Sequence, residues 1–121
     1  MGLFKKSKPA ATPIDYDSID AVKVQTNLLV MTEAKDRQAA IKMLSVGSLV
    51  ALKRTVSNGH NTYVVTDLKN GKIIGEISYG TSDYLAQNYG KCNMLGKVSE
   101  IGRLTPNGRG TQVKIEYKVY L

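Results

Sequence analysis

The sequence is poor in the residues that metal sites, disulfides and most catalytic centres require. Its 121 residues include one cysteine, Cys92, one histidine, His60, and no tryptophan. A single cysteine excludes an internal disulfide, and without other ligands nearby Cys92 is expected to be a reduced, inert thiol. One histidine supports neither a two-histidine metal motif nor a Ser-His-Asp arrangement. We therefore expect no enzymatic activity, no metal and no other cofactor.

Long apolar runs are also missing. The longest, Leu28 to Met31, is far shorter than the roughly 20 residues that a membrane-spanning helix needs. Residues 1–14 are charged but lack the apolar core of a signal peptide. We expect a flexible basic tail over residues 1–14, one domain over residues 15–121, no membrane association and a cytoplasmic location, because this length supports one core and hardly two.

Acidic side chains are scarce in the second half of the chain. Residues 15–44 carry four basic and five acidic side chains, whereas residues 45–121 carry ten basic and five acidic ones. The net charge of +7 therefore lies mainly on the predicted β-rich part and on three lysines of the tail. Such an excess could face a polyanion, or it could simply keep a small domain soluble.

Three β-strands with two tight connections form the clearest block, between residues 46 and 78. Ser48–Arg54 is apolar on both faces before ending in two cations, and Thr62–Thr66 is β-branched and aromatic. Lys72–Ser78 completes the block. We expect a polar loop over Ser57–Asn61 and a type I′ turn at Asn70-Gly71, where both residues accept a positive φ.

The flanking segments predict further strands and two short helices. The run from Ala21 to Met31 predicts two short strands, or one bent strand with Gln25–Asn27 at the bend. Helices are predicted over Thr32–Leu44, with Thr32 as the N-cap, and over Ser82–Gly90. The buried side of the first helix is expected to consist of Ala40, Ile41 and Leu44.

The C-terminal run shows the most regular alternation in the sequence. Gln112–Leu121 predicts a strand with period two, in which one face carries Val113, Ile115, Tyr117, Val119 and Leu121. Another strand is predicted over Met94–Arg103, and Gly75 is expected to mark a bulge or a close approach of two backbones. The sequence thus predicts an all-β barrel of about six strands with one or two short helices.

The order of these features resembles the HIRAN domain family. That family has a Gly-led apolar strand ending in a basic residue, an Asn/Asp-rich loop, an Asn-led strand and a Gly-turn hairpin with an Ile-Gly pair. Here these elements are Gly47–Arg54, Asn58–Asn61 and Ile74–Ile77. Downstream, Ser82–Gly90 is similar to the short helix of the family, and Lys97–Ile101 with the last ten residues to its closing strands.

The resemblance implies a small OB-like β-barrel and a role in binding DNA. In a helicase-like member of the family, this domain grips the 3′ end of single-stranded DNA. The family loop usually reads Asn-Pro-Tyr-Asp, with the Asp on the terminal nucleotide, whereas this chain has Asn58-Gly59-His60-Asn61. The resemblance therefore implies the fold, but not recognition of a 3′ end.

A nucleic-acid contact face is expected where strand ends bring cations, amides and aromatic rings together. The predicted contact residues are Lys53, Arg54, Asn58, His60, Asn61, Tyr79, Arg103 and Arg109.

Other interpretations of these residues stay open. His60 could be a solvated loop residue, and Tyr79, Tyr84 and Tyr89 could pack in the core or at its rim. The same surface could also bind a protein partner, which would make the chain an adaptor domain. Salt separates the two hypotheses, because phosphate binding weakens steeply as the salt concentration rises.

Overall fold

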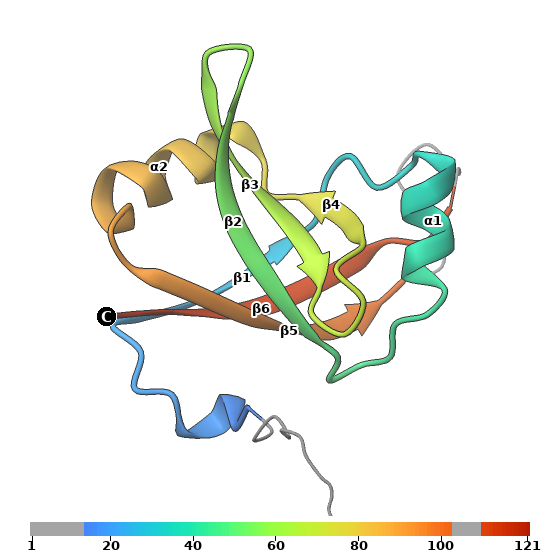
Figure 1. Cartoon of the computed structure of the whole chain (residues 1–121), viewed down its shortest axis with the longest axis horizontal. Helices are drawn as coiled ribbons and strands as arrows, with labels where there is room; N and C mark the ends of the chain where they lie inside the picture. Colours follow the sequence, from blue (N-terminus) through green and yellow to red (C-terminus); the bar gives the residue numbers. More distant parts are fainter. Residues whose placement is uncertain (1–13, 103–109) are drawn as a thin grey trace, which may run out of the picture.

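The computed structural model describes residues 14–102 and 110–121, with the side chain of Ser57 left out. These residues form six antiparallel strands in one open sheet, together with two α-helices (Figure 1). The strands are β1 (Lys23–Leu28), β2 (Leu49–Ser57), β3 (His60–Asp67), β4 (Ile73–Glu76), β5 (Asn93–Ile101) and β6 (Val113–Tyr120). The helices are α1 (Lys35–Ile41) and α2 (Tyr79–Tyr89), and a short 3₁₀ turn, η1 (Tyr16–Ser18), precedes β1. The β-rich class and the two short helices are therefore confirmed.

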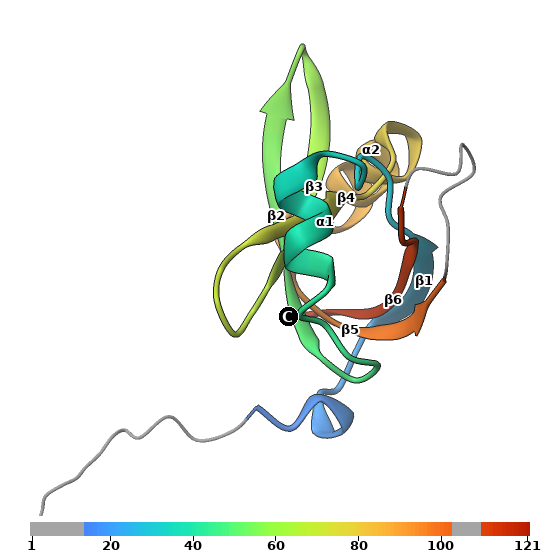
Figure 2. The same cartoon turned by 90° about the vertical axis from the view of Figure 1, so that its right-hand side faces the viewer.

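The sheet has the strand order β1-β6-β5-β2-β3-β4 and is strongly curled (Figure 2). Its two edge strands are linked at one point just after β1. There, Val30 donates its N–H to the carbonyl of Glu76 at 2.8 Å, and Glu76 donates back to Val30 at 2.9 Å. The rest of β1 beyond this bridge keeps an open edge.

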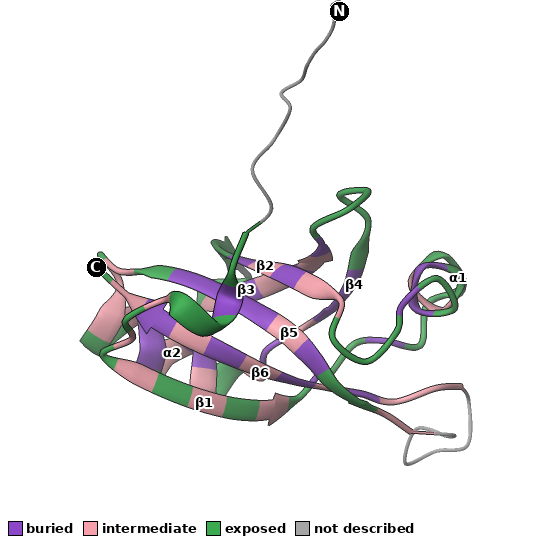
Figure 3. Ribbon diagram, turned by 90° about the horizontal axis from the view of Figure 1, so that it is seen from below, coloured by how far each residue is buried: buried purple, intermediate pink, exposed green. Residues whose placement is uncertain are grey.

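The core lies on the inner face of the curled sheet. Val113, Ile115, Tyr117 and Val119 of β6 are all fully buried, which confirms the predicted period of two. The alternation of buried and half-buried residues along β6 is visible in Figure 3. Leu121 does not continue this face: it lies beyond β6 and is 89% exposed, so its predicted place in the core is wrong.

Two of the predicted turns differ from the structure. The polar loop predicted over Ser57–Asn61 is a two-residue turn, because β2 extends to Ser57, β3 starts at His60, and Asn58 and Gly59 have φ values of 52° and 77°. At Asn70-Gly71 only Gly71 has a positive φ, so the predicted type I′ turn is wrong. Asn70 instead accepts the Lys72 N–H on its side chain at 2.9 Å.

Two predicted elements near the N-terminal end also need correction. β1 runs straight through Gln25–Asn27, where a bend was predicted, because these residues pair in register with β6. α1 starts at Lys35 after the N-cap Ala34, so Thr32 is not the cap. Instead, the Thr32 carbonyl accepts a hydrogen bond from the Gln38 side-chain amide at 2.8 Å. Ala40, Ile41 and Leu44 are buried as predicted, although Leu44 lies beyond the end of α1 at Ile41.

Gly75 lies where two backbones approach closely, as expected. A Cβ at this position would lie 2.9 Å from Thr32 Cγ2 and 3.1 Å from the Val30 carbonyl oxygen. The register between β3 and β4 also shifts at Val65 and Thr66, beside this residue. The absence of a side chain at Gly75 is what allows the segment after β1 to bond to β4.

The 3₁₀ turn η1 packs on the outer face of the sheet. Its Tyr16 is buried and donates its hydroxyl to Glu116 at 3.0 Å. Lys118 donates from Nζ to the carbonyls of Tyr16, Asp17 and Ile19 at 3.0–3.3 Å. These contacts fix η1 to β6. The predicted tail lies outside the described residues except Ile14, which is exposed.

Candidate nucleic-acid interface

Helix α2 is fixed to the edge of β3 by a buried hydroxyl. β4 ends at Glu76, and after it Ile77 still donates its N–H to the Tyr63 carbonyl at 2.9 Å, which leaves the Tyr63 N–H to bond to another segment. Ser82 occupies this edge: its Oγ accepts the Tyr63 N–H at 3.1 Å and donates to the Ile77 carbonyl at 3.0 Å. Because Ser82 is fully buried, these bonds hold the first turn of α2 against the β2–β3 hairpin.

Tyr79, the first residue of α2, stacks its ring on that of His60, the first residue of β3. The rings of His60 and Tyr79 lie 4.9 Å apart between centroids and 16° from parallel. His60 is exposed and Tyr79 is 45% exposed. Next to them, Asn61 donates to the carboxylate of Asp83 at 3.4 Å. The start of β3 and the start of α2 therefore form one polar and aromatic surface.

Arg54 lies at the opposite end of the helix. It faces Tyr63 in the register of β2 and β3, and its Nη1 would be 3.0 Å from a Cβ added at Gly90. A pocket of about 380 Å³ is lined by Arg54 and residues 86–92, which include Lys91. No ion pair of Arg54 or Lys91 is found within residues 14–102 and 110–121. Both cations are therefore available to a ligand.

A further exposed aromatic ring lies between the two ends of α2. Tyr84 is 44% exposed and contacts Tyr89 edge-on, with 6.2 Å between ring centroids. Lys23 of β1 places its Nζ 5.7 Å from the centre of the Tyr84 ring. Three exposed rings, including the His60 imidazole, and three cations thus lie on or around α2. We call this set the α2 surface; it consists of His60, Tyr79, Tyr84, Lys23, Arg54 and Lys91.

Several other cations are engaged by the protein itself. Lys97 and Lys118 place their Nζ atoms 5.1 and 4.8 Å from the centre of the Tyr16 ring, and Lys114 pairs with Glu100 at 3.4 Å. Lys118 also donates to η1, as described above. Lys97 and Lys118 therefore anchor the N-terminal segment to the outer face of β5 and β6. Near α2, Lys23 is engaged with the Tyr84 ring, whereas Arg54 and Lys91 have no ion pair or ring contact among the described residues.

The structure brings some of the predicted contact residues together and separates others. Arg54, His60, Asn61 and Tyr79 all lie beside α2. Lys53 points to the opposite face of β2 from Arg54, because successive strand residues alternate, and Asn58 lies in the hairpin turn. Arg103 and Arg109 lie outside the described residues.

Three members of the α2 surface were not predicted from the sequence as contact residues. Tyr84 was predicted mainly to pack in the core or at its rim, and neither Lys23 nor Lys91 was predicted to contact a ligand. The alternation of Lys23 with Val22 and Val24 could have indicated that the lysine and the valines lie on opposite faces. Nothing local in the sequence places Lys23 over Tyr84.

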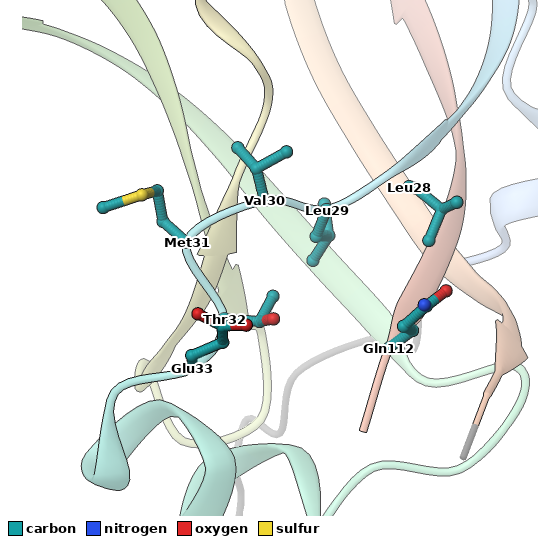
Figure 4. Close-up of a pocket in the computed structure, with 7 residues that line it drawn as sticks. All are labelled: Leu28, Leu29, Val30, Met31, Thr32, Glu33 and Gln112. Atoms are coloured by element: carbon teal, nitrogen blue, oxygen red, sulfur yellow. The ribbon is translucent and has the colours of Figure 1, made fainter. Parts of the chain in front are cut away.

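Another pocket, of about 300 Å³, lies between the end of β1 and α1 (Figure 4). It is lined by Leu28, Leu29, Val30, Met31, Thr32, Glu33 and Gln112. Among the described residues that line it, Glu33 is the only charged one. This lining lacks the cations and exposed rings that distinguish the α2 surface.

Buried tyrosines make the domain sensitive to alkaline pH. Burial raises the pKa of Tyr117, whose hydroxyl donates to Asn27 Oδ1 at 2.6 Å, and burial together with the bond to Glu116 raises the pKa of Tyr16. An unfolded tyrosine titrates near pH 10, so above this pH the unfolded chain binds fewer protons than the folded one. The free energy of unfolding should therefore fall as the pH rises beyond about 10.

Replacing Tyr117 with phenylalanine should make this fall less steep. One fewer tyrosine then titrates on unfolding, so the slope should decrease by up to about 1.4 kcal/mol per pH unit. Urea denaturation of both proteins at several pH values between about 8 and 11 would measure the two slopes. Parallel slopes would show that Tyr117 ionises equally easily in the folded and unfolded chains.

The described residues contain no cluster of three or more potential metal ligands, and no helix among them is long and apolar enough to cross a membrane. A comparison of the chain with known protein families, curated proteins and solved structures finds no match.

Proposed function

We propose that this chain is a non-catalytic module that binds single-stranded nucleic acid along the α2 surface in the cytoplasm. DNA is the ligand that the resemblance to the HIRAN family favours. We also propose that the curled sheet is an OB-like barrel of that family. The order of strands and helices and the bridge between Val30 and Glu76 support this assignment.

The observation that carries the proposal is the arrangement of rings and cations along α2. Proteins that bind single strands combine rings on which bases stack with cations that follow the phosphates. Tyr79 and Tyr84 offer two exposed rings, and Arg54 and Lys91 offer free cations at the far end. The eleven residues of α2 span about 16 Å, which accommodates a few nucleotides.

His60 has a supporting role in this arrangement. Because it stacks on one face of the Tyr79 ring, it restricts the rotation of that ring. A base would then stack on a ring that is already oriented. Pre-orientation of this kind lowers the entropy lost on binding.

A titration against labelled oligonucleotides tests the proposal. Single strands, duplexes and 3′-phosphorylated single strands should be compared at two salt concentrations. We expect preference for single strands, affinity that falls steeply with salt, and little effect of the 3′-phosphate, because the family's Asp is missing here. Absence of binding at low salt would overturn the proposal and leave the adaptor hypothesis, in which the same surface binds a protein.

Arg54 provides a test of the phosphate contact. Replacing Arg54 with alanine should weaken binding to all sequences similarly and reduce the slope of log K against log salt by about 1, because a phosphate contact carries no base information. Lys53→Ala is the matched control, since it removes a neighbouring charge from the opposite face of β2. Equal effects of the two substitutions would show that only net charge matters.

A further inference from the structure

Strand β1 carries its side chains in an unusual orientation. Its polar residues Lys23, Gln25 and Asn27 are half-buried on the inner face, while Val24 and Leu28 are 54% and 48% exposed on the outer face. Val22 and Val30 extend the exposed apolar row on either side. Apolar residues directed toward solvent along an edge strand indicate a surface that another chain covers.

The backbone of β1 is also available on this edge. Leu29 donates its N–H to Val113 of β6, whereas the next residue, Val30, bonds to Glu76 on the other side. Peptide groups alternate in direction along an antiparallel strand. Val24, Thr26 and Leu28 are in phase with Val30, so we infer that their N–H and C=O groups point away from β6. The free edge does not include Val22, because Val22 donates its N–H to Val119 of β6 at 2.8 Å. Figure 3 shows β1 along the margin of the sheet.

The exposed row is symmetric about Thr26. It reads Val22, Val24, Thr26, Leu28, Val30, so a valine or leucine stands at equal distances on both sides of the threonine. We propose that two copies of the chain associate through antiparallel pairing of their β1 strands around a twofold axis at Thr26. The edge is self-complementary in this register, which is what a twofold interface requires.

The register follows from the direction of the free peptide groups. The two Thr26 residues would form a hydrogen-bonded pair on the axis. On either side of it, Val24 of one copy would pair with Leu28 of the other. These pairs place apolar side chains opposite each other on the outer face. On the inner face, Gln25 would lie opposite Asn27 of the second copy, so an amide meets an amide.

Charge along the edge permits this pairing. Residues 24–30 contain no charged side chain, so none of the lysines that usually protect an exposed edge lies in the paired segment. In the proposed register Lys23 lies opposite Leu29 of the second copy, so the two lysines do not face each other. The bridge to Glu76 ends the pairing at Val30, which limits the interface to one short strand and predicts a concentration-dependent dimer.

Sedimentation or light scattering of the whole chain tests the proposal. Between about 10 μM and 1 mM, the average mass should rise from the monomer value of 13.2 kDa toward twice that value. A mass that stays at the monomer value throughout would overturn the proposal. It would leave the edge to an extended segment of another protein.

A charge-swap pair of variants tests the register. Thr26→Lys and Thr26→Asp should each weaken self-association at least tenfold, because like charges would meet at the twofold axis. An equimolar mixture of the two variants should recover the dimer, since opposite charges then meet. Thr55→Lys, at an exposed position of β2, is the matched control and should associate like the unmodified chain. Unchanged dimerisation of either Thr26 variant alone, or no recovery in the mixture, would overturn the register.

Discussion

Replacing Leu85 with alanine should lower the free energy of unfolding by about 2–5 kcal/mol, the usual cost of a large cavity in a well-packed core. Leu85 is fully buried and belongs to the main hydrophobic cluster. It is the apolar residue that joins the middle of α2 to the sheet, whereas the buried hydroxyl of Ser82 fixes only the first turn. Urea denaturation followed by circular dichroism would measure the loss.

A matched substitution on the same helix separates packing from helix propensity. Gln87 is exposed, and Gln87→Ala should change the free energy of unfolding by no more than about 0.5 kcal/mol. A loss below about 1 kcal/mol for Leu85→Ala would show that α2 is not packed on the core as described. Since α2 carries the proposed contact residues, Leu85→Ala should also weaken nucleic-acid binding.

The parts of the fold that were predictable from sequence are those with one buried face. β6 alternates strictly because its inner residues are fully buried, and the buried side of α1 was identified from its apolar spacing. Gly75 was also predicted to mark a close approach, because a glycine inside a strand often lies where another backbone comes near. In each case burial imposes a pattern on neighbouring residues.

The errors occur where the pattern is reversed or where turn geometry decides. β1 exposes Val24 and Leu28 and turns its amides inward, and it runs straight through Gln25–Asn27, where a bend was predicted. Asn58-Gly59 and Asn70-Gly71 have the same sequence, yet only the first has a positive φ at both residues. The connection after β3 closes through Asp67, which accepts the N–H of Gly71 at 2.7 Å on its carbonyl, and this longer turn is not visible in the dipeptide.

The candidate site was predictable only in part for a related reason. His60 was predicted as a contact residue because it lies in a turn-rich segment, and Tyr79 because it follows a strand end. Their contact depends on Ser82, which brings α2 onto the edge of β3, and the contact between Lys23 and Tyr84 joins segments far apart in the sequence. Such long-range juxtaposition follows from the order of strands in the sheet, which no local pattern encodes.

Replacing Tyr79 with alanine should weaken binding of single-stranded DNA by about 5- to 150-fold, which corresponds to about 1–3 kcal/mol for the loss of one stacked base. Tyr79 is 45% exposed, so its replacement should change the free energy of unfolding little. Tyr79→Phe is the matched control: it keeps the aromatic face and should bind like the unmodified protein. Fluorescence anisotropy with a labelled oligonucleotide at fixed salt would measure all three affinities. If Tyr79→Ala binds as tightly as the unmodified chain, bases do not stack at this position and the α2 surface is not the binding site.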